Sequence, residues 1–406
     1  MKRMTSFLLL CAVGGFAIFS STIAKNPVLP ILAREIGANQ ALIGLIAAAS
    51  TVTGIVTSLP AGLLSDRAGR RPVLIASGVV FFTAPLLYLL IRAPWQLALV
   101  RVYHGLATAV FGPVAMAYVA DLAPTRRGER LGYYTSTTLA GRAIAPSVGG
   151  AILTLGAWQG VYVACAIAGF LALIGMLLLP DTQSREAKTE AASEQRASLG
   201  SIMRNGAILV TSVAEAAQFL AFGALEAFLP LYALSHGISK MAVGLLFTVQ
   251  IGVRTLARPL MGKLSDEHGR HLPILLGLGL TAVSMALFTQ TGSWPLLLAL
   301  SVAFGLGLSI ASAATSAYVA DLAPAAGRGA ALGFMSTIMD VGQTTGPILL
   351  GALLYQASQL DLAEAVSYQI GFAVIGGLVL VATLLFALVT IPYRRRADEQ
   401  HTTAVI

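Results

Sequence analysis

Eight charged side chains stand inside long apolar stretches of this chain. Five are basic and three are acidic, and they are Lys25, Arg101, Arg142, Arg254, Arg258, Glu215, Glu226 and Asp340. A charge in apolar surroundings is costly, so such a residue pairs with another or serves a function. A buried carboxyl can exchange a proton near neutral pH, and a basic side chain can hold an anion. These residues predict proton transfer or ion recognition within an apolar body.

The three carboxyl groups differ in how well they suit a proton-coupling role. Asp340 and Glu215 lie deep in their apolar runs and are the first choices, whereas Glu226 lies about one helical turn before Pro230, near a boundary. For each of them, a structural ion pair with an arginine such as Arg254 or Arg142 is an equal alternative.

Polar and charged residues in the same runs are candidates to line a substrate cavity. His104 is the ambiguous member, because it either titrates or packs as a neutral ring between helices. The full set is Lys25, Asn26, His104, Arg142, Gln218, Gln250, Arg254 and Gln343.

The elements that must position these groups are membrane-spanning helices. The chain has 406 residues, 56% of them hydrophobic and 11% charged, where soluble domains carry about 25% charged residues. Apolar runs long enough to cross a bilayer as a helix recur throughout. They predict an all-α integral membrane protein with twelve spans, at 6–31, 41–64, 72–92, 96–121, 131–156, 160–180, 205–234, 241–264, 272–291, 295–321, 331–356 and 367–391.

The net charge of +8 reflects orientation and does not indicate a nucleic-acid partner. Most basic residues fall in segments that alternate with spans in the way the positive-inside rule requires, which predicts that both termini are cytoplasmic. The apolar N-terminus resembles a signal peptide, but cleavage would break the pairing of halves, so we expect it to be the first helix. Cys11 and Cys165 lack metal-site spacing, and no metal or cofactor is expected.

The octapeptide AYVADLAP occurs at 117–124 and again at 317–324. Other residues match at the same offset, so the chain is predicted to consist of two homologous six-helix bundles, 1–180 and 204–392. A polar cytoplasmic linker, 181–203, joins them, and 393–406 forms a cytoplasmic tail. Duplicated halves of this kind imply alternating access to a central site.

The sequence GLLSDRAGRRPVL at 62–74 resembles the loop signature of the major facilitator superfamily, and the resemblance covers the whole chain. It implies a gate in which an acid caps a helix end and pairs with the loop arginine; the alternative is a set of ordinary solvated loop charges. The gate residues are predicted to be Gly62, Asp66, Gly69, Arg70 and Asp121, with Asp266, Arg270 and Asp321 in the second half.

A second set of residues resembles the antiporter motif of twelve-helix drug:proton exporters within that superfamily. It comprises Gly132, Gly141, Ala145, Pro146, Gly149 and Gly150, with Ala145 where the family usually has glycine. A stripe of small residues also serves plain helix packing. Arg101 resembles the arginine that these exporters use in proton exchange, and its counterpart in the second half is Ser301.

Together these features predict a secondary transporter that exports a small organic molecule or drug in exchange for protons. The alternative is transport of an anionic or zwitterionic metabolite, in either direction. A further hypothesis, from a different class, is a non-transporting sensor or scaffold. No enzymatic motif is present. The expected partners are substrate, protons and the lipid bilayer. The resemblance implies a monomer in a bacterial inner membrane.

Overall fold

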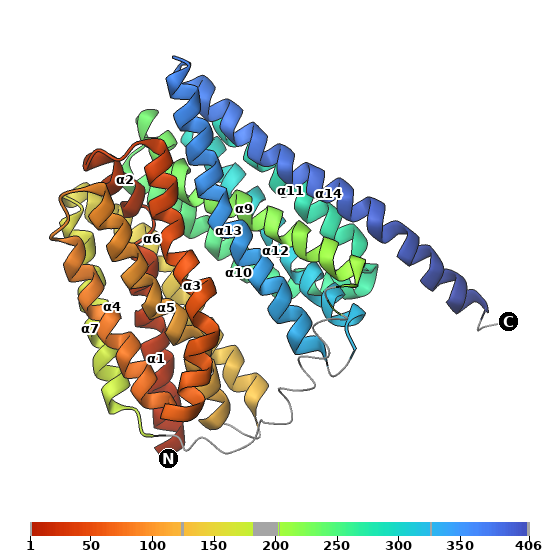
Figure 1. Cartoon of the computed structure of the whole chain (residues 1–406), viewed down its shortest axis with the longest axis horizontal. Coiled ribbons are helices and arrows are strands. Elements are labelled where there is room, and N and C mark those ends of the chain that lie inside the picture. Colours follow the sequence, from red (N-terminus) through yellow and green to blue (C-terminus); the bar gives the residue numbers. More distant parts are fainter. Residues whose placement is uncertain (1, 123–125, 182–201, 203, 325–326, 404–406) are drawn as a thin grey trace. The chain divides into compact units, whose positions relative to one another are not determined.

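The computed structural model describes residues 2–122, 126–181, 202, 204–324 and 327–403, and these residues are almost entirely helical (Figure 1). The part of the predicted linker from 182 to 201, and residue 203, lie outside them. Among the described residues no strand is formed, as predicted for an all-α membrane protein.

The first seven helices are α1 (Lys2–Ile23), α2 (Val28–Glu35), α3 (Gln40–Ala68), α4 (Arg70–Tyr88), α5 (Pro94–Leu122), α6 (Arg127–Leu155) and α7 (Gln159–Leu178). The others are α9 (Gly206–Ser235), α10 (Lys240–His268), α11 (His271–Leu287), the 3₁₀ turn η1 (Phe288–Gln290), α12 (Trp294–Leu322), α13 (Arg328–Gln359) and α14 (Glu364–Thr403). The last helix thus extends through most of the segment predicted to be a tail.

Eleven helical stretches in the described chain are long and apolar enough to cross a membrane. They correspond to eleven of the twelve predicted spans, and the remaining one, 331–356, forms the 32-residue helix α13. Large apolar side chains are widely exposed, among them Leu90 at 71% and Leu256 at 82%. Exposed leucines on this scale suit contact with lipid, in which they need no burial within the protein.

The predicted span 6–31 lies within one candidate span, Met4–Glu35, and a turn at Ala24–Pro27 divides that span into α1 and α2. Pro27 has no backbone N–H to donate and its ring obstructs the preceding helical turn, which accounts for the end of α1. The turn keeps its backbone hydrogen bonds, because the N–H groups of Ala24, Lys25 and Asn26 bond to the carbonyl groups of Ser20 and Thr22.

The chain forms two compact units that do not follow the sequence halves. One comprises Met1–Glu186, Glu226–Ile251 and Pro347–Leu360, and the other comprises Ala187–Leu225, Gly252–Gly346 and Asp361–Ile406. In the first unit α3 packs on α5, α1 on α6 and α7, and α4 on α7; in the second, α11 packs on α12 and α14. The first unit has an aromatic core that includes Phe81, Phe111 and Tyr118.

Candidate functional site

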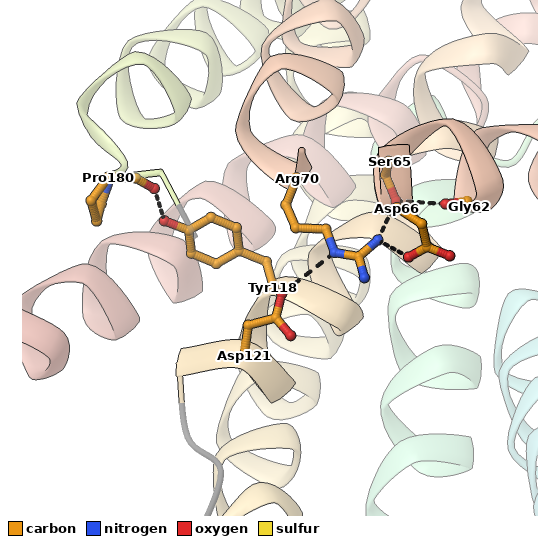
Figure 2. A network of polar contacts seen from close by, with 7 residues as sticks. All are labelled: Gly62, Ser65, Asp66, Arg70, Tyr118, Asp121 and Pro180. Carbon is orange, nitrogen blue, oxygen red and sulfur yellow. Dashed lines mark hydrogen bonds and ion pairs between the residues drawn. The ribbon is translucent and has the colours of Figure 1, made fainter. Parts of the chain in front are cut away.

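The turn between α3 and α4 holds a cluster of charges centred on Arg70, shown in Figure 2. The Arg70 Nη1 lies 2.5 Å from the Asp66 Oδ1, and its Nε lies 3.4 Å from the Asp121 Oδ2 at the end of α5. Nη1 also donates to the Ser65 Oγ at 2.6 Å. Arg70 therefore links the end of α3 to the end of α5.

Glycine makes this turn possible. Gly69 has φ of +91°, a backbone conformation that L side chains rarely adopt, and α4 begins at the next residue. The Ser65 hydroxyl donates to the Gly62 carbonyl at 2.8 Å, which leaves its oxygen free to accept from Arg70 (Figure 2). The loop signature is thus a local fold that aims one guanidinium at two carboxylates.

The second unit repeats this arrangement between α10 and α11. Arg270 bonds to Asp266, its Nε lies 2.9 Å from the Asp321 Oδ2, and Gly269 has φ of +78°. Burial lowers the pKa of Arg270, but the hydrogen bonds and charges of Asp266 and Asp321 outweigh it, and the net pKa is raised. The structure therefore brings together the predicted gate residues in both loops.

Two glycines of the antiporter motif, Gly141 and Gly150, lie at close backbone contacts between helices. A Cβ on Gly141 would lie 2.5 Å from the Gly15 carbonyl oxygen, and one on Gly150 would lie 2.6 Å from the Lys240 oxygen. Ala145 is fully buried, whereas a Cβ on Gly132 would meet nothing within 4 Å. The stripe on α6 thus permits close helix crossings.

These crossings are reciprocal within the first unit. Gly244 of α10 contacts the Pro146 carbonyl of α6, and Gly44 of α3 contacts the Pro347 carbonyl of α13. Gly44 corresponds to Gly244, and Pro146 to Pro347, in the sequence repeat. Reciprocal contacts of this kind are what two-fold symmetry produces, here between duplicated segments of one chain.

A charge cluster forms at the break between α1 and α2, in the same unit. The Lys25 Nζ lies 2.5 Å from the Glu226 Oε2, and the Asn26 Nδ2 donates to the Glu226 Oε1 at 2.7 Å. Arg142 of α6 is close enough to attract the Glu226 charge, and its side chain is exposed. Glu226, first interpreted as a possible boundary residue, is 6% exposed and engaged at both oxygens.

Glu215 lies in a separate polar network in the second unit. Its two oxygens accept hydrogen bonds from Ser312 at 2.7 Å and Thr315 at 2.9 Å, both on α12. Gln218, one turn along α9, donates to Thr281 at 3.0 Å and to the Gly307 carbonyl at 3.1 Å. Glu215 and Gln218 are 2% and 0% exposed, so the network is sealed by protein.

Arg101 and His104 are also buried, in the first unit. Arg101 donates to Ser50 of α3, and its Nε has no hydrogen-bond partner among the described residues. The His104 Nδ1 lies 3.4 Å from the Tyr88 hydroxyl, and its Nε2 is without a described partner. At 3% and 2% exposure, both side chains pack between helices.

The remaining predicted residues are dispersed. Arg254 stacks over Phe219 and Phe222, with its Cζ 4.9 and 5.6 Å from the ring centroids. Asp340 and Gln343 are partly exposed on α13. Gln250 is 1% exposed and neither of its amide atoms has a described partner.

Sequence reasoning missed the hydroxyl groups that serve the charged residues: Ser65, Ser265, Ser312 and Thr315. For Ser65 and Ser265 a signal was present, because both stand at the same place in the duplicated loop. Ser312 and Thr315 are three residues apart and so share a helix face, but nothing in their sequence indicates that Glu215 lies opposite. No group of three or more metal-ligating side chains is found in the residues that were described.

Two relatives match nearly the whole length of this chain in sequence. An uncharacterized MFS-type transporter of Methanocaldococcus jannaschii is 25% identical over 380 residues, covering 93% of this chain and 95% of the relative. The multi-drug resistance efflux pump PmrA of Streptococcus pneumoniae is 25% identical over 381 residues, covering 92% and 95%.

Solved structures agree on the fold. A bacterial homolog to the human lysosomal transporter Spinster, solved in an inward-facing and unoccupied conformation, superposes with a TM-score of 0.82 at 16% identity, covering 95% of this chain and 96% of that one. The family model described as Major Facilitator Superfamily matches residues 10–249 and 211–404. The chain is therefore a member of the Major Facilitator Superfamily, a multi-pass membrane transporter with that family's helical fold.

Proposed function

We propose that this transporter exports a small organic molecule in exchange for protons by alternating access. Export is supported by the antiporter-type stripe on α6 and by relatives that include a multi-drug resistance efflux pump. The two loop clusters around Arg70 and Arg270 would act as the gate on the cytoplasmic side. Their charges can part and rejoin as the helix ends move, which a core of apolar contacts would resist.

The observation that carries the proton-coupling proposal is the environment of Glu215. Both its oxygens are bound by hydroxyl groups, Ser312 and Thr315. A hydroxyl can donate to an ionised carboxylate and can also accept from a protonated one, so this site accommodates both states. Glu215 is therefore our first choice for the proton carrier, with Asp340, Glu226 and Arg101 as the other candidates.

The test is proton release from everted membrane vesicles acidified by respiration, with lumenal pH read after addition of cationic, neutral and anionic compounds. Release on addition of one class supports antiport and identifies that class. Glu215→Gln should abolish release while substrate binding persists, and Asp340→Asn is the matched comparison. Normal release in Glu215→Gln would remove Glu215 from the mechanism.

The expected setting is a bacterial inner membrane, with both termini cytoplasmic and the protein monomeric. The distribution of basic residues supports this orientation. Single cysteines at Arg92 and Arg270, introduced into a cysteine-free chain, should react from outside and from inside, respectively, with a membrane-impermeant thiol reagent. The opposite labelling would reverse the topology.

A second candidate function is transport of an anionic or zwitterionic metabolite. It is favoured by the cluster at the α1–α2 break, where Lys25 pairs with Glu226 and the charge of Arg142 is attracted to the same carboxylate. The vesicle panel separates the two, because release with anions alone would favour the metabolite reading.

A further inference from the structure

The break between α1 and α2 places a lysine, an asparagine and an opposing carboxylate together in a membrane-spanning segment. Lys25 and Asn26 lie in the turn Ala24–Pro27, and both bind Glu226 of α9, at 2.5 and 2.7 Å. The backbone is kinked there, and the N–H groups of Ala24, Lys25 and Asn26 still bond to the carbonyl groups of Ser20 and Thr22. Discontinuous membrane helices commonly mark binding sites in transporters.

The charges in this cluster do not balance. Lys25 and Arg142 are both attracted to Glu226, which leaves one positive charge in excess at this place. Both cations are accessible, since the Lys25 side chain is 22% exposed and Arg142 is exposed, whereas the Glu226 side chain is 7% exposed. Excess positive charge that is accessible within a membrane protein favours an anionic ligand.

An unused acceptor lies beside this charge. Asn26 is 1% exposed, its amide nitrogen is engaged by Glu226, and its Oδ1 has no hydrogen-bond partner among the described residues. A buried acceptor without a donor loses free energy that a ligand O–H or N–H can restore. The ligand that meets both conditions has a carboxylate and a donor next to it.

We propose that Lys25, Asn26, Arg142 and Glu226 form a binding site for a small 2-hydroxy- or 2-amino-carboxylate. The ligand carboxylate is bound by Arg142 and Lys25, and its neighbouring O–H or N–H donates to the Asn26 Oδ1. Glu226 remains as the counter-ion and also attracts an ammonium group. This inference rests on the proposed transport function only for its consequence, which is that this anion is the cargo.

The site also explains an asymmetry between the sequence halves. Asn26 corresponds to Glu226, and Arg142 corresponds to Gln343, so the duplicated positions carry different chemistry. A symmetric pair would offer two equal sites or two like charges. Because of this divergence, the cluster has one carboxylate that attracts two cations, and one acceptor, the Asn26 Oδ1, without a described partner.

Equilibrium binding to the purified full-length chain tests the proposal. Lactate and alanine are the probes with a donor, propionate has the carboxylate without the donor, and choline is the cation, each measured by calorimetry in lipid nanodiscs at fixed ionic strength. We expect lactate or alanine to bind at least about tenfold more tightly than propionate, since the donor restores a buried hydrogen bond, and choline not to bind.

Substitutions assign the binding to these residues. Arg142→Gln replaces Arg142 with the residue type found at the equivalent position of the second half. It should weaken lactate binding at least about tenfold through loss of a charge-assisted bond. Asn26→Leu should reduce affinity for lactate to that for propionate. Glu226→Gln should weaken the binding of alanine more than the binding of lactate. Arg67→Gln, which removes an exposed arginine at the end of α3 outside the site, is the control and should change affinity less than twofold.

The outcomes distinguish this inference from the transport proposal, because binding needs no proton gradient. Carboxylate binding that Arg142→Gln and Lys25→Gln leave unchanged, or no carboxylate binding by folded wild-type protein, would overturn the site. Binding as expected, without proton release in vesicles, would leave the site intact and defeat proton antiport. Proton release with cations alone, without carboxylate binding, would support proton antiport and overturn the carboxylate site.

Discussion

The Arg70 and Arg270 clusters are two copies of one loop, and they differ in depth. The side chain of Arg70 is 10% exposed and that of Arg270 is 22% exposed, while the acids Asp121 and Asp321 are 31% and 55% exposed. The serine bond is 2.6 Å in the first copy and 3.3 Å in the second. The repeated sequence determines which residues come into contact. The surrounding helices determine how buried each contact is, and therefore how much it contributes to stability.

Removing the arginine should give the largest difference between the copies. Arg70→Ala leaves Asp66 and Asp121 without their partner in a half-buried place and should cost about 2 kcal/mol, between the values for exposed and buried pairs. Arg270→Ala should cost below about 1 kcal/mol, because water replaces the lost contact. The apparent melting temperature in detergent should fall more for Arg70→Ala.

Arg67→Ala is the control for this pair, since Arg67 is exposed on the same turn of α3. It should leave the melting temperature unchanged. Equal losses in Arg70→Ala and Arg270→Ala would show that depth does not distinguish the two clusters.

The glycines should behave alike where the arginines differ. Gly69→Ala and Gly269→Ala place a side chain at φ of +91° and +78°, and backbone conformations of this kind cost a non-glycine residue about 1–3 kcal/mol. A Cβ at Gly69 would meet only the Pro72 Cδ, at 3.6 Å, and one at Gly269 meets nothing within 4 Å. Both variants should lose similar stability, measured by thermal unfolding.

Gly62→Ala is the matched comparison for the glycine pair, because Gly62 lies within a helix and a Cβ there has open space. It should be neutral or stabilising, as alanine favours a helix more than glycine does. A much larger loss at Gly69 than at Gly269 would mean that packing, rather than backbone conformation, limits the first turn.

Removing the serine should also destabilise the first cluster more than the second, but by less than removing the arginine does. Ser65→Ala removes a 2.6 Å bond to a buried guanidinium and should cost about 1 kcal/mol, whereas Ser265→Ala removes a 3.3 Å contact and should cost about half of that or less. Thermal unfolding of each variant against its own wild-type preparation measures this. A larger loss in Ser265→Ala would contradict the ranking by burial.

Sequence predicted the helical membrane fold well because hydrophobic length and short loops determine it. It did not predict the break at Ala24–Pro27, although Pro27 and Pro30 stand within the apolar run. A hydropathy run averages over such residues, and only the structure shows that the backbone turns there. The repeat did predict which loop residues are equivalent, so both charge clusters were accessible from sequence.

The pairing of Lys25 and Asn26 with Glu226 was not predicted, although Asn26 and Glu226 are equivalent positions of the repeat. Equivalent residues meet only close to the axis that relates the duplicated segments. Sequence offset does not say which positions lie near that axis. The hydroxyl partners of Glu215 were missed for a similar reason, because serine and threonine are common on membrane helices and carry no charge to mark them.

Salt should produce the smallest effect and the finest test of the two clusters. At about 1 M salt the screening length falls to about 3 Å, compared with about 10 Å at 0.1 M. Screening acts mainly where water and ions reach the pair, so the penalty of Arg270→Ala should shrink towards zero in high salt. The penalty of Arg70→Ala should largely persist, because its guanidinium is nearly buried and also bonds to Ser65.

Melting temperatures of wild type and both variants in 0.1 M and about 1 M sodium chloride supply the measurement. If high salt removes both penalties equally, ions reach both clusters, and the difference in depth has no consequence for their strength.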